Sequence, residues 1–295
     1  MKCQWVELIY LQILGKKTTI LLISYKAKQI HTMTVQHPIL NYKQSGTGEN
    51  IVLIHGLFGS LENLNMVAKP LSERFCVTSV DVRNHGSSFH FDDMEYKNLA
   101  QDIIDLLDHL AIDKCILLGH SMGGKIAIQV ALAHAERINK LIIADIAPVS
   151  YPPHHVEIIK GLQAIDLSKV TKRKDADEQL SAFVDEVGVR QFLLRNLALD
   201  QAGHFSFRCS LPDISLCYPQ IMKANELDRN SKPYQGETLF IKGGNSNYIL
   251  AEHRAKIAEL LPNSKAKIIQ GAGHWLHAEK TTAFNKIVLD FINIH

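Results

Sequence analysis

Gly119-His120-Ser121-Met122-Gly123 lies between an apolar run, residues 115–118, and a helix-like segment, residues 124–134. Gly-x-Ser-x-Gly between a strand and a helix is the pattern of a nucleophile elbow, in which a serine occupies a sharp, strained turn. The flanking residues must be small, so that the chain can fold back and a substrate can approach. The pattern predicts that Ser121 is a nucleophile at a sheet edge and that the backbone N–H of Met122 faces a developing oxyanion.

Short apolar runs alternate with longer helical patterns on both sides of this stretch. The alternation predicts an α/β fold with a mostly parallel, doubly wound sheet of about eight strands. Runs this short and apolar are typical of strands buried on both faces. The expected strands are residues 51–54, 77–80, 115–118, 141–144, 238–241 and 266–269. Helices are expected over residues 96–110, 125–137, 251–261 and 282–292, and a short antiparallel hairpin over residues 34–45.

The alternation breaks between residues 151 and 235. This stretch opens with Tyr151-Pro152-Pro153 and carries helical patterns without a convincing buried strand. A helical insert after the sixth strand would cover the carboxyl edge of the sheet, where ligands bind in open α/β folds. We therefore expect residues 151–235 to form a lid, and residues 33–150 and 236–295 to form the core.

Residues 1–32 are rich in apolar side chains but do not fit the core pattern. Glu7, Gln12 and the pair Lys16-Lys17 interrupt the apolar stretch, so it lacks the continuous length that a membrane span needs. No small-residue cleavage site follows it, which makes it a poor signal peptide. We expect an N-terminal extension outside the core fold and no stable membrane span.

The bulk composition is that of an ordinary soluble globular protein. The chain has 295 residues, 46% of them hydrophobic, and a formal net charge of +2 with scattered basic residues, so no nucleic-acid partner is expected. Its five cysteines form an odd set without a CxxC motif, and Cys76 and Cys115 are expected to be buried thiols. This usage favours a reducing compartment, and hence a cytoplasmic protein.

A serine hydroxyl is a weak nucleophile until a base takes its proton. Gly273-His274-Trp275 follows the last expected strand and precedes the final helix, so His274 is the candidate base. A carboxylate must hold the other imidazole nitrogen, and the expected chain order is Ser, acid, His. Asp145 stands at the carboxyl end of the strand after the nucleophile helix and is the favoured acid; Asp81 and Glu252 are the alternatives.

An oxyanion hole needs a second backbone donor. His55-Gly56-Leu57-Phe58-Gly59 follows the first strong strand, and the motif assigns the N–H of Leu57 to this role. The loop that begins at Asp81 lies after the next strand and is expected to shape the floor of the site. Phe58 and Trp275 are expected to bind substrate and, with apolar residues of the lid, to line an acyl pocket.

These features together resemble the α/β-hydrolase superfamily over about residues 34–295. Within it they look like small bacterial serine esterases that act on acyl esters and acyl-CoA thioesters. In many relatives the acid follows the strand at residues 238–241, but here that loop, Gly243-Gly244-Asn245-Ser246-Asn247-Tyr248, holds no carboxylate. The motifs that carry the resemblance are His55-Gly-Leu-Phe-Gly-Ser60, Asp81-Val-Arg-Asn-His-Gly86, Gly119-His-Ser-Met-Gly-Gly-Lys125, Ala144-Asp-Ile-Ala-Pro148 and Gly273-His-Trp275. The resemblance implies Asp145 as the acid.

Competing interpretations are weaker. Gly119 to Lys125 imitates a phosphate-binding loop, but Ile126 stands where a Ser or Thr should ligate Mg²⁺. No HExxH motif or zinc-type ligand set occurs, so neither a metal nor a cofactor is expected. The other histidines of these motifs, His55, His85 and His120, are expected to be hydrogen-bonded packing residues near the site, and His277 is expected to be a helix-start residue.

The sequence therefore predicts a serine hydrolase that cleaves small-molecule carboxylic esters or acyl thioesters through an acyl-enzyme. Two other functions stay open. One is a lyase or C–C hydrolase on the same scaffold, and the other is a non-catalytic module that uses the pocket to bind a ligand.

Overall fold

The computed structural model describes residues 8–14, 17–23, 30–35, 38–227 and 232–293. The chain forms two compact units, residues 1–38 and residues 39–295. The first unit contains a three-stranded antiparallel sheet of β1 (Leu8–Leu14), β2 (Lys17–Ile23) and β3 (Ile30–Val35). Parts of the extension expected over residues 1–32, namely residues 1–7, 15–16 and 24–29, lie outside the described residues.

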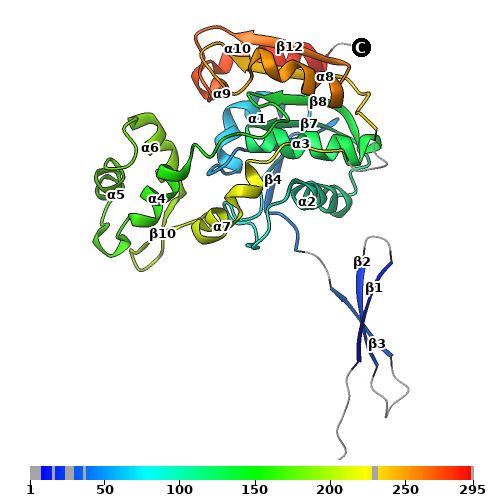
Figure 1. The fold of residues 1–295 in the computed structure, drawn as a ribbon, viewed down its shortest axis with the longest axis horizontal. Coiled ribbons are helices and arrows are strands. Elements are labelled where there is room, and N and C mark those ends of the chain that lie inside the picture. Colours follow the sequence, from blue (N-terminus) through cyan, green and yellow to red (C-terminus); the bar gives the residue numbers. More distant parts are fainter. Residues whose placement is uncertain (1–7, 15–16, 24–29, 36–37, 228–231, 294–295) are drawn as a thin grey trace, which may run out of the picture. The chain divides into compact units, whose positions relative to one another are not determined.

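The second unit is built on a seven-stranded sheet with the order β12-β11-β8-β7-β5-β6-β4 (Figure 1). Adjacent strands run parallel, except that β4 pairs antiparallel with β6. Its strands are β4 (Tyr42–Ser45), β5 (Asn50–Ile54), β6 (Cys76–Val80), β7 (Cys115–His120), β8 (Ile138–Ala144), β11 (Thr238–Gly243) and β12 (Ser264–Ile269).

Helices cover both faces of this sheet because its strands carry apolar side chains on both sides. Val52 and Ile54 belong to one buried cluster, and their neighbours Ile51 and Leu53 belong to the other. The first cluster includes α2 (Tyr96–His109), α3 (Met122–Ala133) and the end of α8 (Arg254–Leu260). The second includes α1 (Asn65–Leu71), α9 (Leu276–Glu279) and α10 (Thr281–Ile292).

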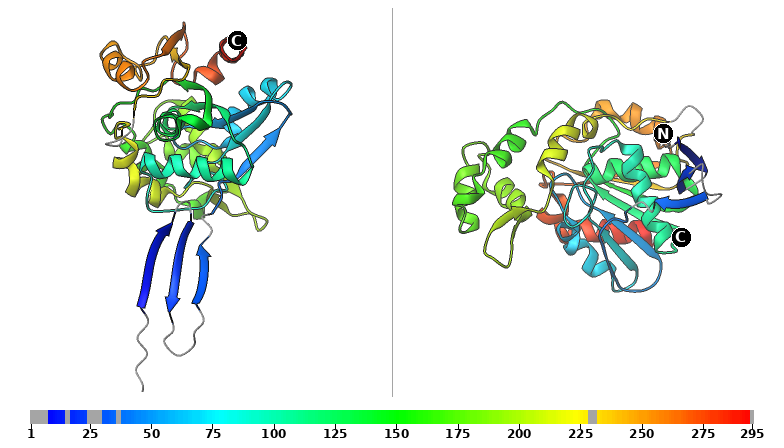
Figure 2. Two further views of the ribbon diagram at one scale, coloured as in Figure 1. Left: turned by 90° about the vertical axis from the view of Figure 1, so that its right-hand side faces the viewer. Right: turned by 90° about the horizontal axis from the view of Figure 1, so that it is seen from below.

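The segment between β8 and β11 is called the helical insert, residues 151–235. It contains α4 (Val156–Ala164), α5 (Arg173–Leu180), α6 (Val187–Leu193) and α7 (Leu211–Ile221). It also contains two short paired strands, β9 (Leu197–Leu199) and β10 (Phe205–Phe207), which the sequence did not indicate. Helices α4, α5 and α6 lie to one side of the central sheet, whereas α7 lies close to α2 and α3 (Figures 1 and 2).

Several details differ from the expectations. The sheet has seven strands in the described part of the chain rather than about eight, and the insert follows its fifth strand, β8, rather than a sixth. The hairpin expected over residues 34–45 is wrong, because β4 pairs with β6 instead. Strand β12 is not buried on both faces: it lies at the sheet edge, and Ile268 is 54% exposed.

The two cysteines expected to be buried differ in exposure. Cys115 is buried as expected, whereas Cys76 is only half-buried. None of the helices in the described ranges has both the length and the apolar character that crossing a bilayer requires.

Candidate active site

Ser121 occupies a strained turn between β7 and α3. Its backbone has φ +53° and ψ −122°, a conformation that costs a non-glycine residue about 1–3 kcal/mol. The glycines around it are needed because the chain folds back tightly. A Cβ on Gly119 would overlap the backbone of Gly123, and a Cβ on Gly123 would overlap the carbonyl oxygens of Ile54 and His55. The strand–turn–helix geometry predicted for this motif is therefore present.

His274 lies on the loop between β12 and α9, and its side chain is 16% exposed. Its Nε2 is 3.0 Å from Ser121 Oγ, and its Nδ1 is 2.8 Å from Asp145 Oδ2. In the neutral tautomer that fits these partners, Nδ1–H donates to the carboxylate and Nε2 accepts from the serine hydroxyl. The structure thus brings together the three residues that the sequence selected as nucleophile, base and acid.

Asp145 follows β8 directly and is completely buried. Its φ of +52° lies in the left-handed region, which aspartate tolerates better than most residues. The Oδ1 atom accepts a 2.9 Å hydrogen bond from Gly243 N, and Oδ2 accepts hydrogen bonds from Ser246 Oγ and His274 Nδ1. The sequence did not point to Ser246. The available signal was that its loop holds no carboxylate, which leaves this position free for a residue that supports the acid on the neighbouring strand.

The two alternative acids have other partners. Asp81 accepts hydrogen bonds from Leu61 N at 2.7 Å, Asn41 Nδ2 at 2.7 Å and Ser87 N at 2.9 Å, so it ties loops together beneath the site. Glu252 is 76% exposed and lies 3.9 Å from His253. Among the described contacts, neither carboxylate reaches His274.

Tyr248 is a second residue that the sequence did not single out. Its ring stacks on the imidazole of His274, with centroids 3.7 Å apart and planes at 13°. The rest of Tyr248 is held by hydrogen bonds: its N–H donates to Ser246 Oγ at 3.2 Å, and its carbonyl accepts from the Tyr151 hydroxyl at 2.6 Å. The Tyr248 hydroxyl lies 2.8 Å from His154 Nε2.

The candidate oxyanion donors lie on either side of the nucleophile. Met122 is the first residue of α3, and Gly56 packs so closely on the elbow that a Cβ there would lie 3.1 Å from Ser121 Cβ. In the described part of the chain, no hydrogen bond uses the N–H of Leu57 or of Met122. The next amide along the loop, Phe58 N, is already engaged, because it donates to His85 Nε2 at 3.1 Å.

Buried histidines beneath the pocket are held neutral by their surroundings. Burial lowers the pKa of His85 to about 3 and that of His277 to about 4, and it also lowers the pKa of His55 and His120. The ring of His55 bridges Gly56 O at 2.7 Å and Val82 N at 3.0 Å. The Nε2 of His120 lies 2.9 Å from the carbonyl of His274 and so supports the backbone of the catalytic loop.

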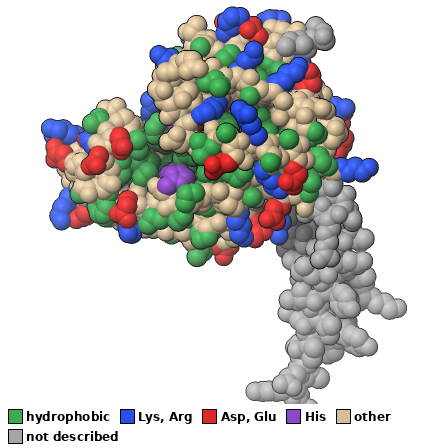
Figure 3. Space-filling view, turned by 45° about the horizontal axis from the view of Figure 1, so that its top comes forward, with side chains coloured by type: hydrophobic (Ala, Val, Ile, Leu, Met, Phe, Trp, Pro, Cys, Tyr) green, Lys and Arg blue, Asp and Glu red, His purple; other side chains and the backbone are tan. Residues whose placement is uncertain are grey.

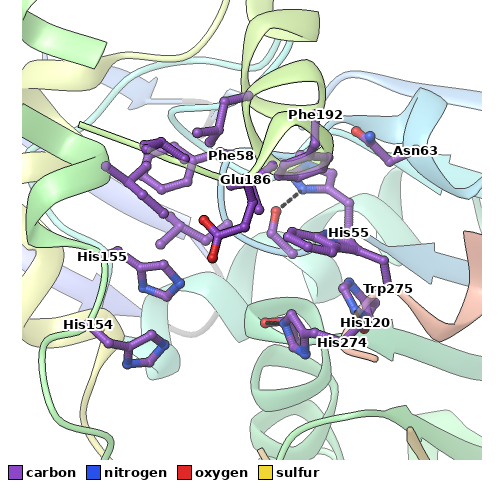
Figure 4. Close-up of a pocket in the computed structure, with 18 of the residues that line it drawn as sticks. His55, Phe58, Asn63, His120, His154, His155, Glu186, Phe192, His274 and Trp275 are labelled. Atoms are coloured by element: carbon purple, nitrogen blue, oxygen red, sulfur yellow. Dashed lines mark hydrogen bonds between the residues drawn. The ribbon is translucent and has the colours of Figure 1, made fainter. Parts of the chain in front are cut away.

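A pocket of about 570 Å³ opens over Ser121 and His274. Phe58 and Trp275 line it, and Phe183 and Phe192 of the helical insert contribute to its wall. Figure 4 shows His274 and Trp275 on one side of the pocket and His154 and His155 on the other. In the space-filling view, apolar and histidine side chains meet in a hollow between the insert and the rest of the unit (Figure 3).

Lys125 does not form a phosphate-binding site. It is 1% exposed, and its Nζ donates to Val149 O at 3.0 Å and to Lys223 O. Burial lowers its pKa to about 7. The lysine therefore ties the first turn of α3 to the chain between β8 and α4 and to the chain just after α7. Over the described residues, no three His, Cys, Asp or Glu side chains are grouped as metal ligands.

The chain is similar to known proteins over most of its length. The family model described as the alpha/beta hydrolase fold matches residues 49–281. The sn-1-specific diacylglycerol lipase ABHD11 of Mus musculus is 39% identical over 250 residues, which are 82% of this chain and 80% of that protein. Esterase YbfF of Escherichia coli (strain K12) is 38% identical over 244 residues, which are 82% of this chain and 92% of that protein.

A solved structure agrees with these relatives. The structure of a marine microorganism esterase matches with a TM-score of 0.83 and 36% sequence identity, covering 86% of this chain and 100% of that one. The family match and the named relatives agree with the mostly parallel sheet of the structure. The named relatives are esterases and a lipase, and this chain belongs with them to the α/β-hydrolase fold family.

Proposed function

We propose that the chain cleaves carboxylic esters or acyl thioesters through a Ser121–His274–Asp145 triad and an acyl-enzyme intermediate. One observation carries the proposal: a single imidazole contacts both the hydroxyl of Ser121, at 3.0 Å, and the buried carboxylate of Asp145, at 2.8 Å. This is the arrangement that a serine needs to lose its proton as it attacks a carbonyl.

In the first half of the reaction Ser121 Oγ attacks the acyl carbonyl while His274 Nε2 takes its proton. Asp145 holds the imidazole in the correct tautomer and stabilises the imidazolium that forms. The N–H groups of Leu57 and Met122 donate to the oxyanion, each contributing about 3 kcal/mol as oxyanion donors do in comparable sites.

In the second half, His274 gives its proton to the departing alkoxide or thiolate. A water molecule, activated by the same imidazole, then attacks the acyl-enzyme and releases the acid. Phe58 and Trp275 bind the apolar part of the substrate. This role is supported by their position, because both line the pocket above Ser121.

The domain organisation is part of the proposal. Residues 151–235 act as a lid on a core of residues 33–150 and 236–295, and residues 1–32 are an extension outside that core. The lid role is supported by Phe183 and Phe192, which belong to the insert and line the pocket. A cytoplasmic location is supported by the free thiols of Cys76, Cys115, Cys209 and Cys217.

A fluorophosphonate probe tests the chemistry directly. We expect the wild-type protein to be labelled and to hydrolyse p-nitrophenyl esters, and Ser121→Ala to do neither. Ser87→Ala, which changes an exposed serine, is the matched control and should behave as wild type. No labelling of the wild type, under conditions that label a reference hydrolase, would favour a non-catalytic binding module. Labelling without hydrolysis of any ester or thioester in a substrate panel would favour a lyase or C–C hydrolase.

A further inference from the structure

Two cavities of very different size meet at Ser121. The large pocket, of about 570 Å³, is lined by His274 and Trp275. The small cavity, of about 20 Å³, lies beside Met122. A single water molecule needs about 10–15 Å³ on this kind of measure, so the small cavity accepts a group of methyl size.

The chemistry of acyl transfer assigns a different part of the substrate to each cavity. His274 must protonate the leaving group, so the leaving group has to lie on the side of that imidazole. The described residues that line the small cavity include Met122, a proposed oxyanion donor, but not His274. In a tetrahedral intermediate the acyl substituent and the leaving group take different directions from the reacting carbon. The substituent is thus directed away from His274, towards the small cavity.

The walls of the small cavity are fixed by hydrogen bonds. The Tyr96 hydroxyl donates to Ile221 O at 2.7 Å, and the Tyr151 hydroxyl accepts from Ala147 N at 2.9 Å. Lys125 Nζ donates to Val149 O at 3.0 Å. A longer acyl chain that displaced these three side chains would have to break buried hydrogen bonds. The side chain of Met222, which has no such bond to any described residue, closes another part of the cavity wall.

The large pocket has room for a bulky group that is mainly apolar. Its apolar lining includes Phe58, Ile158, Val184, Val189, Phe192 and Leu193, and polar side chains such as Asn63 and Glu186 also line it (Figure 4). Its volume lies in the range of pockets that enclose a small organic molecule.

We propose that the small cavity is the acyl subsite and takes an acetyl-sized group, while the large pocket holds a bulky apolar alcohol or thiol. The substrate class is then an acetate ester or acetyl thioester of a large apolar leaving group. This inference rests on the proposed serine-hydrolase function, because it uses the positions of His274 and Met122 relative to Ser121.

Two isomeric esters test the assignment on the wild-type protein. Octyl acetate and methyl nonanoate have the same composition, but their short and long chains are exchanged between the acyl and alcohol sides. Forcing extra methylenes into a fixed cavity is expected to lower kcat/KM for methyl nonanoate by about 10–100-fold relative to octyl acetate. Equal rates, or faster hydrolysis of methyl nonanoate, would overturn the assignment.

Two variants extend the test. Met222→Ala widens the small cavity and should raise the kcat/KM ratio of p-nitrophenyl butyrate to p-nitrophenyl acetate by about tenfold. Val189→Ala widens only the large pocket and should leave that ratio unchanged. A ratio that moves in Val189→Ala and not in Met222→Ala would place the acyl group in the large pocket.

The two levels of the proposal fail in different ways. If Ser121 is not labelled by the fluorophosphonate and neither isomer is hydrolysed, the proposed function fails. If Ser121 is labelled and p-nitrophenyl esters are hydrolysed, but the two isomers react equally or not at all, the acyl-subsite assignment alone fails.

Discussion

Replacing Asp145 by Asn probes the triad without changing its shape. The carboxylate accepts from Gly243 N on one oxygen and from His274 Nδ1 and Ser246 Oγ on the other. An amide has one acceptor and one donor end, so it cannot accept from both sets as the carboxylate does. With its NH₂ towards Gly243, the amide faces a buried N–H that cannot change from donor to acceptor, which costs about 1–3 kcal/mol.

The opposite orientation of the amide is therefore the stable one. With its NH₂ towards His274, the Ser246 hydroxyl can rotate and the imidazole can change tautomer, so every group keeps a partner. In that tautomer Nε2 carries the proton and cannot accept one from Ser121. A preference of about 1–3 kcal/mol places all but about 1–20% of molecules in this inactive state. With the loss of the negative charge beside the imidazolium, we expect kcat to fall about 10³-fold, and by no more than about 10⁴-fold.

Asp81→Asn is the matched control. Asp81 is also a buried aspartate with three donors, but it has a backbone N–H on each oxygen, from Leu61 and Ser87. Either amide orientation leaves one of these N–H groups without an acceptor, so we expect about 1–3 kcal/mol of lost stability and kcat within tenfold of wild type. The measurements are kcat on p-nitrophenyl acetate and urea unfolding. A kcat for Asp145→Asn within tenfold of wild type would refute the reasoning.

Three further predictions concern the frame around the triad. Tyr248→Leu should lower kcat about 2–10-fold by removing the ring stacked on His274, whereas Tyr248→Phe should keep wild-type kcat; similar values for the two variants would rule out the stacking contribution. In Gly123→Ala the new Cβ would overlap the carbonyl oxygen of Ile54, so the free energy of unfolding in urea should fall by at least about 2 kcal/mol. Gly188→Ala, at an open helical position, should raise it by about 0.5–1 kcal/mol. Equal effects of the two substitutions would contradict the packing argument. Burial lowers the pKa of His85 to about 3 and that of His277 to about 4, so the unfolded chain binds more protons than the folded one below about pH 6.5. The unfolding free energy should therefore fall from pH 6.5 to pH 4, and it should fall less steeply in His277→Gln. Identical slopes would exclude His277 as a source of this pH dependence.

Local sequence was enough to predict the elbow and most of the sheet. The expected strand at residues 115–118 is part of β7. The turn after it can hold Ser121 because only glycine, at positions 119 and 123, leaves room for the tightly folded backbone. Edge strands were harder, because burial depends on what lies next to a strand. Ala266 to Ile269 looked apolar, but β12 ends the sheet and leaves Ile268 half-exposed. The strand β4 gained its partner β6 from a distant part of the chain, and no local pattern carried that pairing.

The supporting residues of the site could not be found from sequence, because their contacts depend on strand order. Asp145 drew attention by its place at a strand end. Ser246 and Tyr248 contact Asp145 and His274 only because β11 lies directly beside β8. Polar and aromatic loop residues are common, so nothing in the loop itself distinguished these two. Lys125 was considered only as part of a phosphate-binding pattern, whereas its role depends on the carbonyls of Val149 and Lys223, which are far apart in the sequence.

The contact between Asp145 and Ser246 has an evolutionary consequence. The two side chains extend from the ends of adjacent strands. Asp145 supplies the carboxylate, and the Ser246 hydroxyl donates to the carboxylate oxygen that also contacts His274. Exchanging them, with Ser at 145 and Asp at 246, would keep one negative charge and one hydroxyl beside the imidazole. A lineage could thus relocate its acid from one strand to its neighbour by two substitutions, passing through a form with both carboxylates and without rebuilding the fold.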